Sequence, residues 1–209
     1  MRKVTLFILF LSIVSALFNP VRSQNTDINT LRSINGSLPG LKPVSRFLTG
    51  TAVPVSLAVP VLMGGYSIID KDKELFKDAF YIAFASGVNL GLTYSLKELI
   101  ARPRPYDSYP GMLEVYELQD DFSMPSGHTS GAFATATALS LKYPKWYIIA
   151  PSFAWAGAVG FSRMHLGVHY PSDVLAGAVL GAGSAWLTWK VNEWLWSRYD
   201  IDGFKIIKR

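Results

Sequence analysis

Five long apolar stretches, separated by short polar joints, constrain the fold of this 209-residue chain more than any other feature of its sequence. They are Thr51–Ile69, Ala79–Leu96, Thr129–Leu141, Trp146–Phe161 and Val174–Trp189. Most of them approach the roughly 20 residues that a helix needs to cross a bilayer. The alternation of apolar and polar residues that marks a half-buried strand is nearly absent. The sequence therefore predicts an all-α, multi-span transmembrane bundle of about five to six helices.

Small residues indicate how these helices pack. Thr129–Leu141 is short and rich in Ala, Ser and Thr, so it can span a membrane only if the other helices surround it. Gly177 and Gly181 are spaced as in a helix-dimer motif, but in a multi-span protein this spacing favours close packing inside one bundle. A soluble helical protein with a very apolar core is the alternative that the pattern leaves open.

The N-terminus has the layout of a secretory signal. Arg2 and Lys3 precede a short apolar run, Val4–Phe18, and small side chains lead to a cleavage point before Gln24. Residues 1–23 are therefore predicted to be a signal peptide, with an uncleaved first membrane helix as the alternative. Either one directs the adjoining chain across the membrane, and residues 24–50 are predicted to form a polar periplasmic segment.

Basic residues orient the predicted bundle. If the chain after Gln24 starts outside, the joints after the first and third stretches lie inside, together with the basic C-terminal tail, residues 198–209. Together with Lys190, which directly follows the last stretch, these parts carry most of the lysines near the apolar stretches, as the positive-inside rule requires: Lys71, Lys73, Lys77, Lys142 and Lys145. Residues 97–127 and 162–171 then lie on the exported face.

Composition excludes several kinds of site. There is no cysteine, so neither a disulfide nor a thiolate metal site can form. The net charge of +5 is scattered along the chain, which suits an anionic substrate or a membrane surface rather than nucleic acid. The sequence gives no indication of a protein partner.

The first chemical signal is the segment KELIARPRP, in which Lys97, Arg102 and Arg104 crowd the outer end of a predicted span. A single lysine there would serve as an interfacial anchor. Charge at a membrane boundary is costly unless it has a function, and arginine can grip a phosphate through two parallel hydrogen bonds. The segment therefore indicates an anion site.

The second signal is SMPSGHTSG, which places Ser126, Gly127 and His128 at the start of a helix. Helix N-termini bind anions through their free N–H groups, and glycine allows a close approach of the backbone. Ser126 or Ser123 could equally be an ordinary N-cap. His128 favours the functional interpretation, because it could give a proton to a leaving oxygen.

The third signal is SRMHLGVHYPSD. His165, His169 and Asp173 succeed one another at four-residue spacing, which would suit metal ligands on one helix. Gly167 and Pro171 interrupt such a helix, and the nearby cations would repel a metal ion. The favoured interpretation is a neutral histidine that is held by a carboxylate through one ring nitrogen and attacks phosphorus with the other.

Together the three segments resemble the type 2 phosphatidic acid phosphatase superfamily, which includes membrane lipid phosphatases, bacterial non-specific acid phosphatases and vanadium haloperoxidases. The signature K-x6-R-P, P-S-G-H and S-R-x5-H-x3-D is complete, with Lys97, Arg104, Arg163, His169 and Asp173 at its charged positions. The resemblance runs from about residue 79 to 189 and implies a phosphatase domain over residues 51–197.

For binding, the resemblance implies a phosphate cradle that requires no metal or other cofactor. Lys97, Arg104 and Arg163 would hold the phosphate oxygens, and Ser126 with the Gly127 N–H would complete the cradle.

For the chemistry, the resemblance implies that His169 attacks phosphorus to form a phosphohistidine and that Asp173 orients it. His128 would protonate the leaving group and then activate water. Arg102 and His165 fall between the signature positions, and we expect them to support the site or line its rim.

The implied enzyme is a phosphatase of membrane lipids in the bacterial cell envelope, at the inner membrane with its active site facing the periplasm. Candidate substrates are lipid A, undecaprenyl pyrophosphate, phosphatidylglycerol phosphate and phosphatidic acid. A secreted acid phosphatase that acts on small phosphomonoesters and a vanadate-dependent oxidase are the alternatives.

Overall fold

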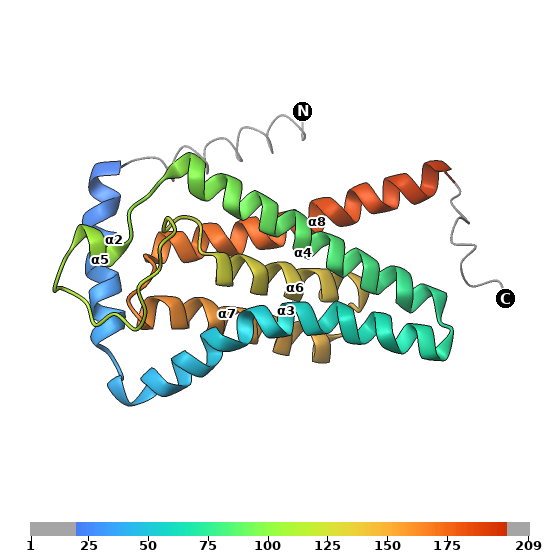
Figure 1. Ribbon diagram of the computed structural model, residues 1–209, viewed down its shortest axis with the longest axis horizontal. Coiled ribbons are helices and arrows are strands. Elements are labelled where there is room, and N and C mark those ends of the chain that lie inside the picture. The colour runs from blue at the N-terminus through green and yellow to red at the C-terminus, as the bar shows by residue number, and fades with distance from the viewer. Residues whose placement is uncertain (1–19, 200–209) are drawn as a thin grey trace.

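The computed structural model describes residues 20–199, which form a bundle of long helices with one further helix lying across its end (Figure 1). The helices are α2 (Pro20–Gly36), α3 (Lys42–Asp70), α4 (Lys73–Ile100), α5 (Pro105–Ser108), α6 (Gly127–Lys142), α7 (Trp146–His165) and α8 (Pro171–Tyr199), with a 3₁₀ turn at Pro39–Leu41. Residues 20–199 contain no strand. The predicted all-α bundle is confirmed, and each apolar stretch lies inside one of the five long helices, α3, α4, α6, α7 and α8.

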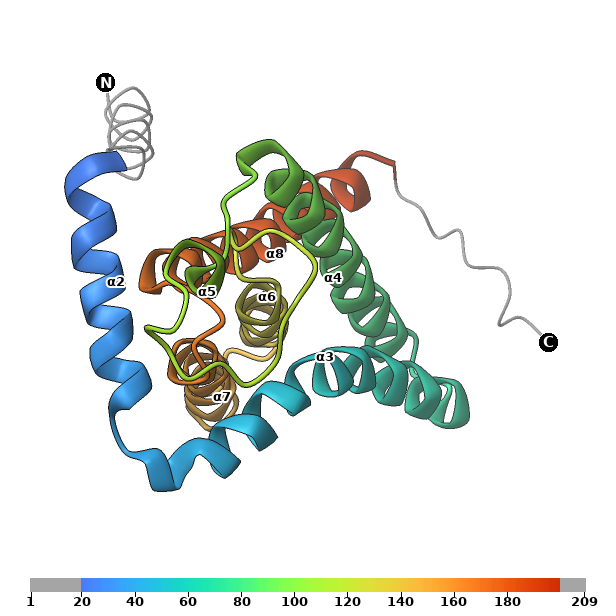
Figure 2. The ribbon, with the colours of Figure 1, turned by 60° about the vertical axis from the view of Figure 1, so that its left-hand side comes forward.

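Helix α6 is the centre of the bundle. It contacts α3, α4, α7 and α8, which surround it in Figure 2. Its buried positions carry small side chains, among them Ala132, Ala134, Ala136 and Ala138. This is the packing of a membrane bundle, in which small residues let helices approach closely.

The two glycines of α8 make that approach possible. A Cβ atom added at Gly177 would lie 2.7 Å from the Ser126 carbonyl oxygen, and one at Gly181 would lie 2.9 Å from the Ala134 nitrogen and still closer to the Ser130 carbonyl oxygen. Neither glycine can therefore carry a side chain without moving α6. Their spacing serves packing inside this bundle.

The outer surface of the bundle is apolar. Large exposed side chains cover the outer faces of the helices: Leu57, Val61, Leu62, Ile69, Phe80, Phe84, Leu90, Leu99, Val179 and Trp186. Within residues 20–199, three segments are long and apolar enough to cross a membrane, namely Pro39–Asp70, Lys73–Ser108 and Pro171–Leu195. Exposed apolar surface of this extent requires a lipid environment, and the soluble alternative is not favoured.

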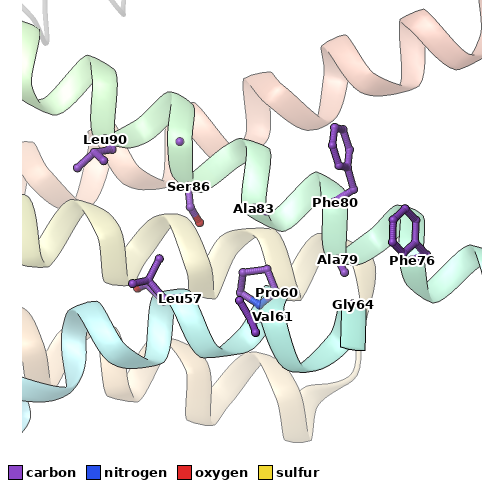
Figure 3. A pocket seen from close by; sticks show the side chains of 12 residues that line it. Leu57, Pro60, Val61, Gly64, Phe76, Ala79, Phe80, Ala83, Ser86 and Leu90 are labelled. Atoms are coloured by element: carbon purple, nitrogen blue, oxygen red, sulfur yellow. The ribbon is translucent and has the colours of Figure 1, made fainter. Parts of the chain in front are cut away.

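An apolar groove lies between α3 and α4 on this surface. It encloses about 420 Å³, and Figure 3 shows Leu57, Val61, Phe80 and Leu90 among its lining side chains. None of the charged or histidine residues of the three sequence motifs lines it. The candidate site therefore lies elsewhere in the bundle.

The N-terminal part of the described chain departs from a simple polar segment. Residues 24–50 are mostly helical, because they form most of α2 and the first turns of α3. Ile28 and Leu31 of α2 are buried against Tyr170, so α2 packs on the end of the bundle near α7 and α8. The predicted signal peptide lies outside the described residues apart from residues 20–23, which open α2.

Candidate active site

The three motifs meet at the end of the bundle that α2 and α5 cover (Figure 1). Lys97 lies in the last turn of α4, and Arg104 immediately precedes α5. Ser126 is the residue that immediately precedes α6, without a side-chain capping hydrogen bond, and Arg163 lies in the last turn of α7. His169 lies in the connection to α8, and Asp173 lies in the first turn of α8. Helix ends thus carry almost every side chain of the site.

His169 is buried between a carboxylate and a guanidinium. Its Nδ1 atom lies 3.5 Å from Asp173 Oδ2, and its Nε2 atom lies 3.4 Å from Arg104 Nη1. The pKa of His169 is lowered to about 3, chiefly by burial and in addition by the charges of Arg163 and Arg104, while Asp173 opposes the shift. The imidazole is therefore neutral at physiological pH, and Nε2 points toward the cations.

Asp173 is fully buried, and donors surround its carboxylate. Oδ2 accepts hydrogen bonds from the Tyr170 N–H at 2.9 Å and from the Ser123 hydroxyl, while Oδ1 accepts one from Arg102 at 2.6 Å. These bonds fix the position of Oδ2 behind the His169 ring. His169 Nδ1 makes no hydrogen bond at its 3.5 Å separation from Oδ2, but the nearby carboxylate charge favours the tautomer with its proton on Nδ1, which leaves a lone pair on Nε2.

Lys97 and Arg104 form the cationic side of the site, and Asp121 lies between them. The Asp121 carboxylate contacts Lys97 Nζ at 3.0 Å and forms a second ion pair with Arg104. Partial burial would raise the pKa of Asp121, but the hydrogen bonds and charges of Lys97 and Arg104 hold it below its ordinary value. An anionic group therefore fits between these two cations.

Arg163 supplies a third cation. The residue is buried, its Nη1 atom donates a hydrogen bond to Thr49 Oγ1 at 2.6 Å, and its Nε atom has no hydrogen-bond partner. Its charge acts on both His128 and His169. A buried N–H without a partner is costly, so this guanidinium is suited to a ligand.

The start of α6 lies against the start of α8. The Ser126 N–H donates to the Asp173 carbonyl oxygen at 3.0 Å, and Ser126 Oγ accepts a hydrogen bond from Thr129. Gly127 is the first residue of α6, and His128 is the second, partly buried and under the charges of Arg163, Arg104 and Lys97. The helix start and His128 therefore face the same cations as His169.

His165 is separate from this cluster. Its ring nitrogens contact Ser45 Oγ at 2.7 Å and the Ser37 carbonyl oxygen at 2.8 Å, and its own carbonyl oxygen accepts a hydrogen bond from Lys42 at 2.6 Å. The side chain ties the end of α7 to Ser37, which follows α2, and to Ser45 in the first turn of α3. Among the described residues, no group of three His, Asp or Glu side chains is arranged to hold a metal ion.

Three side chains at the site were not identified from the sequence as members of it: Asp27, Thr49 and Asp121. Asp121 lies just before the second motif, SMPSGHTSG, and this closeness along the chain is the signal that could have indicated it. Asp27 and Thr49 lie outside all three motifs. Only the packing of α2 and α3 brings them to the site.

Fold and site together define a helical membrane protein with a histidine and cation site for an anion. The chain belongs to the PAP2 superfamily, whose sequence profile matches residues 78–197. This confirms the family resemblance of the three motifs.

Similar proteins agree with this membership. The chain is 28% identical over 112 residues to a lipid A 4'-phosphatase of Bacteroides thetaiotaomicron, covering 51% of this chain and 50% of that protein. It is 33% identical over 111 residues to an undecaprenyl-diphosphatase of Sulfolobus acidocaldarius, covering 53% and 52%. The chain thus spans about half the length of these curated relatives.

A solved structure is similar over nearly the whole chain. It is a transmembrane PAP2-type phosphatidylglycerolphosphate phosphatase from Bacillus subtilis, with a TM-score of 0.74 and 25% identity. The match covers 94% of this chain and 98% of that one.

Proposed function

We propose that this protein is a metal-independent phosphatase that hydrolyses phosphate monoesters or pyrophosphates of membrane lipids through a phosphohistidine intermediate. One observation carries the proposal: the neutral His169 lies with Nδ1 toward Asp173 and Nε2 toward Arg104. A nucleophilic imidazole needs this arrangement, with the orienting group on one nitrogen and the electrophile on the other.

Binding comes first. A phosphate group replaces the Asp121 carboxylate between Lys97 and Arg104, and Arg163 binds it from the α7 side. Ser126 and the Gly127 N–H, at the positive end of α6, complete the contacts to its oxygens. These fixed cations stabilise the charge of the transition state, as Mg²⁺ and arginine do in other phosphoryl-transfer sites.

In the first chemical step the Nε2 lone pair of His169 attacks phosphorus, a P–N bond forms and the bond to the leaving oxygen breaks. His128 gives its proton to that oxygen, which departs as an alcohol or a lipid phosphate. The negative charge of the bound phosphate favours the protonated form of His128 that this step requires. Asp173 stabilises the positive charge that develops on His169.

In the second step His128 accepts a proton from water, and the resulting hydroxide attacks phosphorus. The P–N bond breaks, inorganic phosphate leaves, and His169 returns to its neutral form. His128 is then protonated again, ready for the next turnover.

Relatives and environment point to lipids as the substrate class. The similar proteins are named for lipid A, undecaprenyl diphosphate and phosphatidylglycerolphosphate, which all present a phosphate at a membrane surface. The apolar outer faces of the bundle bring this site to the same surface. The phosphatase domain covers residues 51–197, and the alternative of a secreted acid phosphatase is not favoured.

We place the protein in a bacterial inner membrane with its site facing the periplasm. The connection between α3 and α4 and the one between α6 and α7 lie at the bundle end opposite the site (Figure 1). Lysines lie in these connections and in the helix turns beside them: Lys71, Lys73, Lys77, Lys142 and Lys145. The positive-inside rule assigns that end to the cytoplasm.

The activity test is phosphate release by detergent-purified protein on undecaprenyl pyrophosphate, lipid A, phosphatidylglycerol phosphate, phosphatidic acid and para-nitrophenyl phosphate. His169→Ala is assayed beside wild type after both have passed the same gel-filtration and melting controls. The proposal is supported if the wild type releases phosphate from a lipid and His169→Ala does not. Equal release by both proteins, or release only from para-nitrophenyl phosphate, contradicts it.

The orientation can be tested by cysteine labelling, because the natural chain contains no cysteine. Tyr116→Cys places one thiol in the exposed loop beside the site, and Lys71→Cys places one at the opposite end. A membrane-impermeant maleimide added to spheroplasts should label only the first. Labelling of the second thiol alone would mean that the site faces the cytoplasm.

A further inference from the structure

We infer that Arg102 and Asp27 are positioning residues that act on His169 through Asp173, so that helix α2 is a working part of the active site. The inference rests on the proposed function for the role of His169. It extends the site beyond residues 78–197, the part of the chain that matches the family.

Arg102 connects the two carboxylates. Its Nη1 atom donates to Asp173 Oδ1 at 2.6 Å and to Ser172 Oγ at 2.7 Å, and its Nη2 atom donates to Asp27 Oδ2 at 2.8 Å. The guanidinium carbon lies 3.9 Å from the centre of the Tyr170 ring. These contacts hold the plane of the guanidinium on several sides.

Asp27 reaches the same place from α2. Its side chain is buried, Oδ1 accepts the Ser172 N–H at 3.0 Å, and Oδ2 accepts the Ser172 hydroxyl in addition to Arg102. Asp27 therefore fixes both Arg102 and the first turn of α8. Ile28 and Leu31, buried against Tyr170, hold α2 in this position.

The consequence for His169 depends on the two oxygens of Asp173. Arg102 donates a hydrogen bond to Asp173 Oδ1, while Asp173 Oδ2 is the oxygen that faces His169 Nδ1. A fully buried carboxylate without a cationic partner is destabilised and tends to bind a proton. Without Arg102 the Asp173 carboxyl would either be neutralised or rotate, and in both cases the negative charge 3.5 Å from Nδ1, which favours a proton on that nitrogen, would be lost or displaced.

Arginine suits this place better than lysine. Its planar fork donates to two carboxylates at once, whereas a lysine ammonium is a compact point charge. Arg102→Lys should therefore restore the charge near Asp173 but not the bridge to Asp27.

The first test measures kcat, KM and the inhibition constant of inorganic phosphate on the lipid phosphate that the wild type cleaves fastest. Arg102→Ala and Asp27→Asn should lower kcat by about 10- to 100-fold, as loss of orienting partners does at other sites. KM and the inhibition constant of inorganic phosphate should stay within about twofold, because neither residue contacts the phosphate. Arg102→Lys should recover part of the lost kcat.

Asp78→Asn is the matched control for Asp27→Asn. Asp78 forms an ion pair with Lys142 at 2.8 Å and accepts a hydrogen bond from Tyr143 at 3.0 Å, near the opposite end of the bundle. The Asp78→Asn variant therefore loses an ion pair comparable to that of Asp27, but one that lies far from His169. Its kcat should equal that of the wild type.

A spectroscopic test needs no turnover. The chain has three histidines, so ¹⁵N-histidine NMR in micelles gives few signals, and His169→Ala assigns the relevant one. Wild type and Asp78→Asn should carry the His169 proton on Nδ1. Arg102→Ala should show a mixture of the two tautomers.

The outcomes separate this inference from the proposed function. Wild-type activity with an unchanged kcat and tautomer in Arg102→Ala and Asp27→Asn refutes the positioning role and leaves the phosphatase intact. A parallel loss of kcat and of inorganic phosphate binding refutes it as well, because Arg102 would then bind phosphate. If the tautomer changes in Arg102→Ala but the wild-type protein hydrolyses none of the tested substrates, the positioning role is supported and the proposed phosphatase activity is refuted.

Discussion

Alanine at Gly181 tests whether α6 and α8 pack as closely as the structure shows. The added Cβ would lie 2.9 Å from the Ala134 nitrogen and closer still to the Ser130 carbonyl oxygen. Ordinary contacts begin near 3.4 Å, and both atoms belong to the backbone of α6, which cannot rotate away. The helices must therefore separate along their contact.

The magnitude reflects two opposing effects. Overpacking in a close-packed interior costs about 1–3 kcal/mol, and a backbone clash belongs at the upper end of that range. Replacing glycine by alanine inside a helix returns about 1 kcal/mol through helix propensity. The net loss of unfolding free energy should be about 2 kcal/mol, which lowers the melting temperature of a chain of this size by about 4–8 °C.

Gly183→Ala provides the matched control. It lies on the same helix, and an added Cβ would meet no atom within 4 Å. Only the propensity effect remains, so the melting temperature should be unchanged or slightly higher. Thermal unfolding of both variants in the same detergent gives the comparison, and equal melting temperatures for Gly181→Ala and Gly183→Ala would refute the packing argument.

The site supports four further predictions. Asp173→Asn should lower kcat by about 10³- to 10⁴-fold with a native melting curve, and a wild-type rate would remove Asp173 from the site. Asp121→Asn should lower KM for a lipid phosphate by roughly tenfold, because no carboxylate then competes for Lys97 and Arg104; a higher KM would contradict that competition. The folded state holds the pKa of His169 at about 3, well below its value in the unfolded chain, so stability should decline as pH falls below about 6.5. Melting temperatures at pH 7.5 and 5 should show a smaller decline for His169→Gln. Activity should persist in EDTA and be inhibited by orthovanadate, and loss of activity on chelation would restore a metal hypothesis.

The bundle was predictable because apolar length is a local property of the sequence. Each of the five stretches became the interior of one long helix, and polar or proline residues set the ends. Asp72 caps α4 by accepting the N–H groups of Glu74 and Leu75 at 3.0 Å, and Pro171 opens α8. The glycine spacing in α8 likewise predicted packing inside the bundle, which the approach of α6 confirms.

The structure of residues 24–50 was less predictable. Their composition is polar, and the pattern that predicts a membrane helix is missing there. α2 is nevertheless a helix, because Ile28 and Leu31 are buried against Tyr170 and because Asp27 accepts a hydrogen bond from Arg102. These partners lie far along the chain, and only the folded bundle brings them within reach.

The sequence by itself determined the membrane bundle, the family and the identity of the charged residues, because these depend on length, composition and spacing along the chain. Tertiary structure alone decided which of those residues touch. It placed Asp121 between Lys97 and Arg104, turned His165 away toward Ser45, and joined Arg102 to both Asp27 and Asp173. Contacts of this kind depend on the directions in which helix ends meet, and no local pattern of residues records those directions.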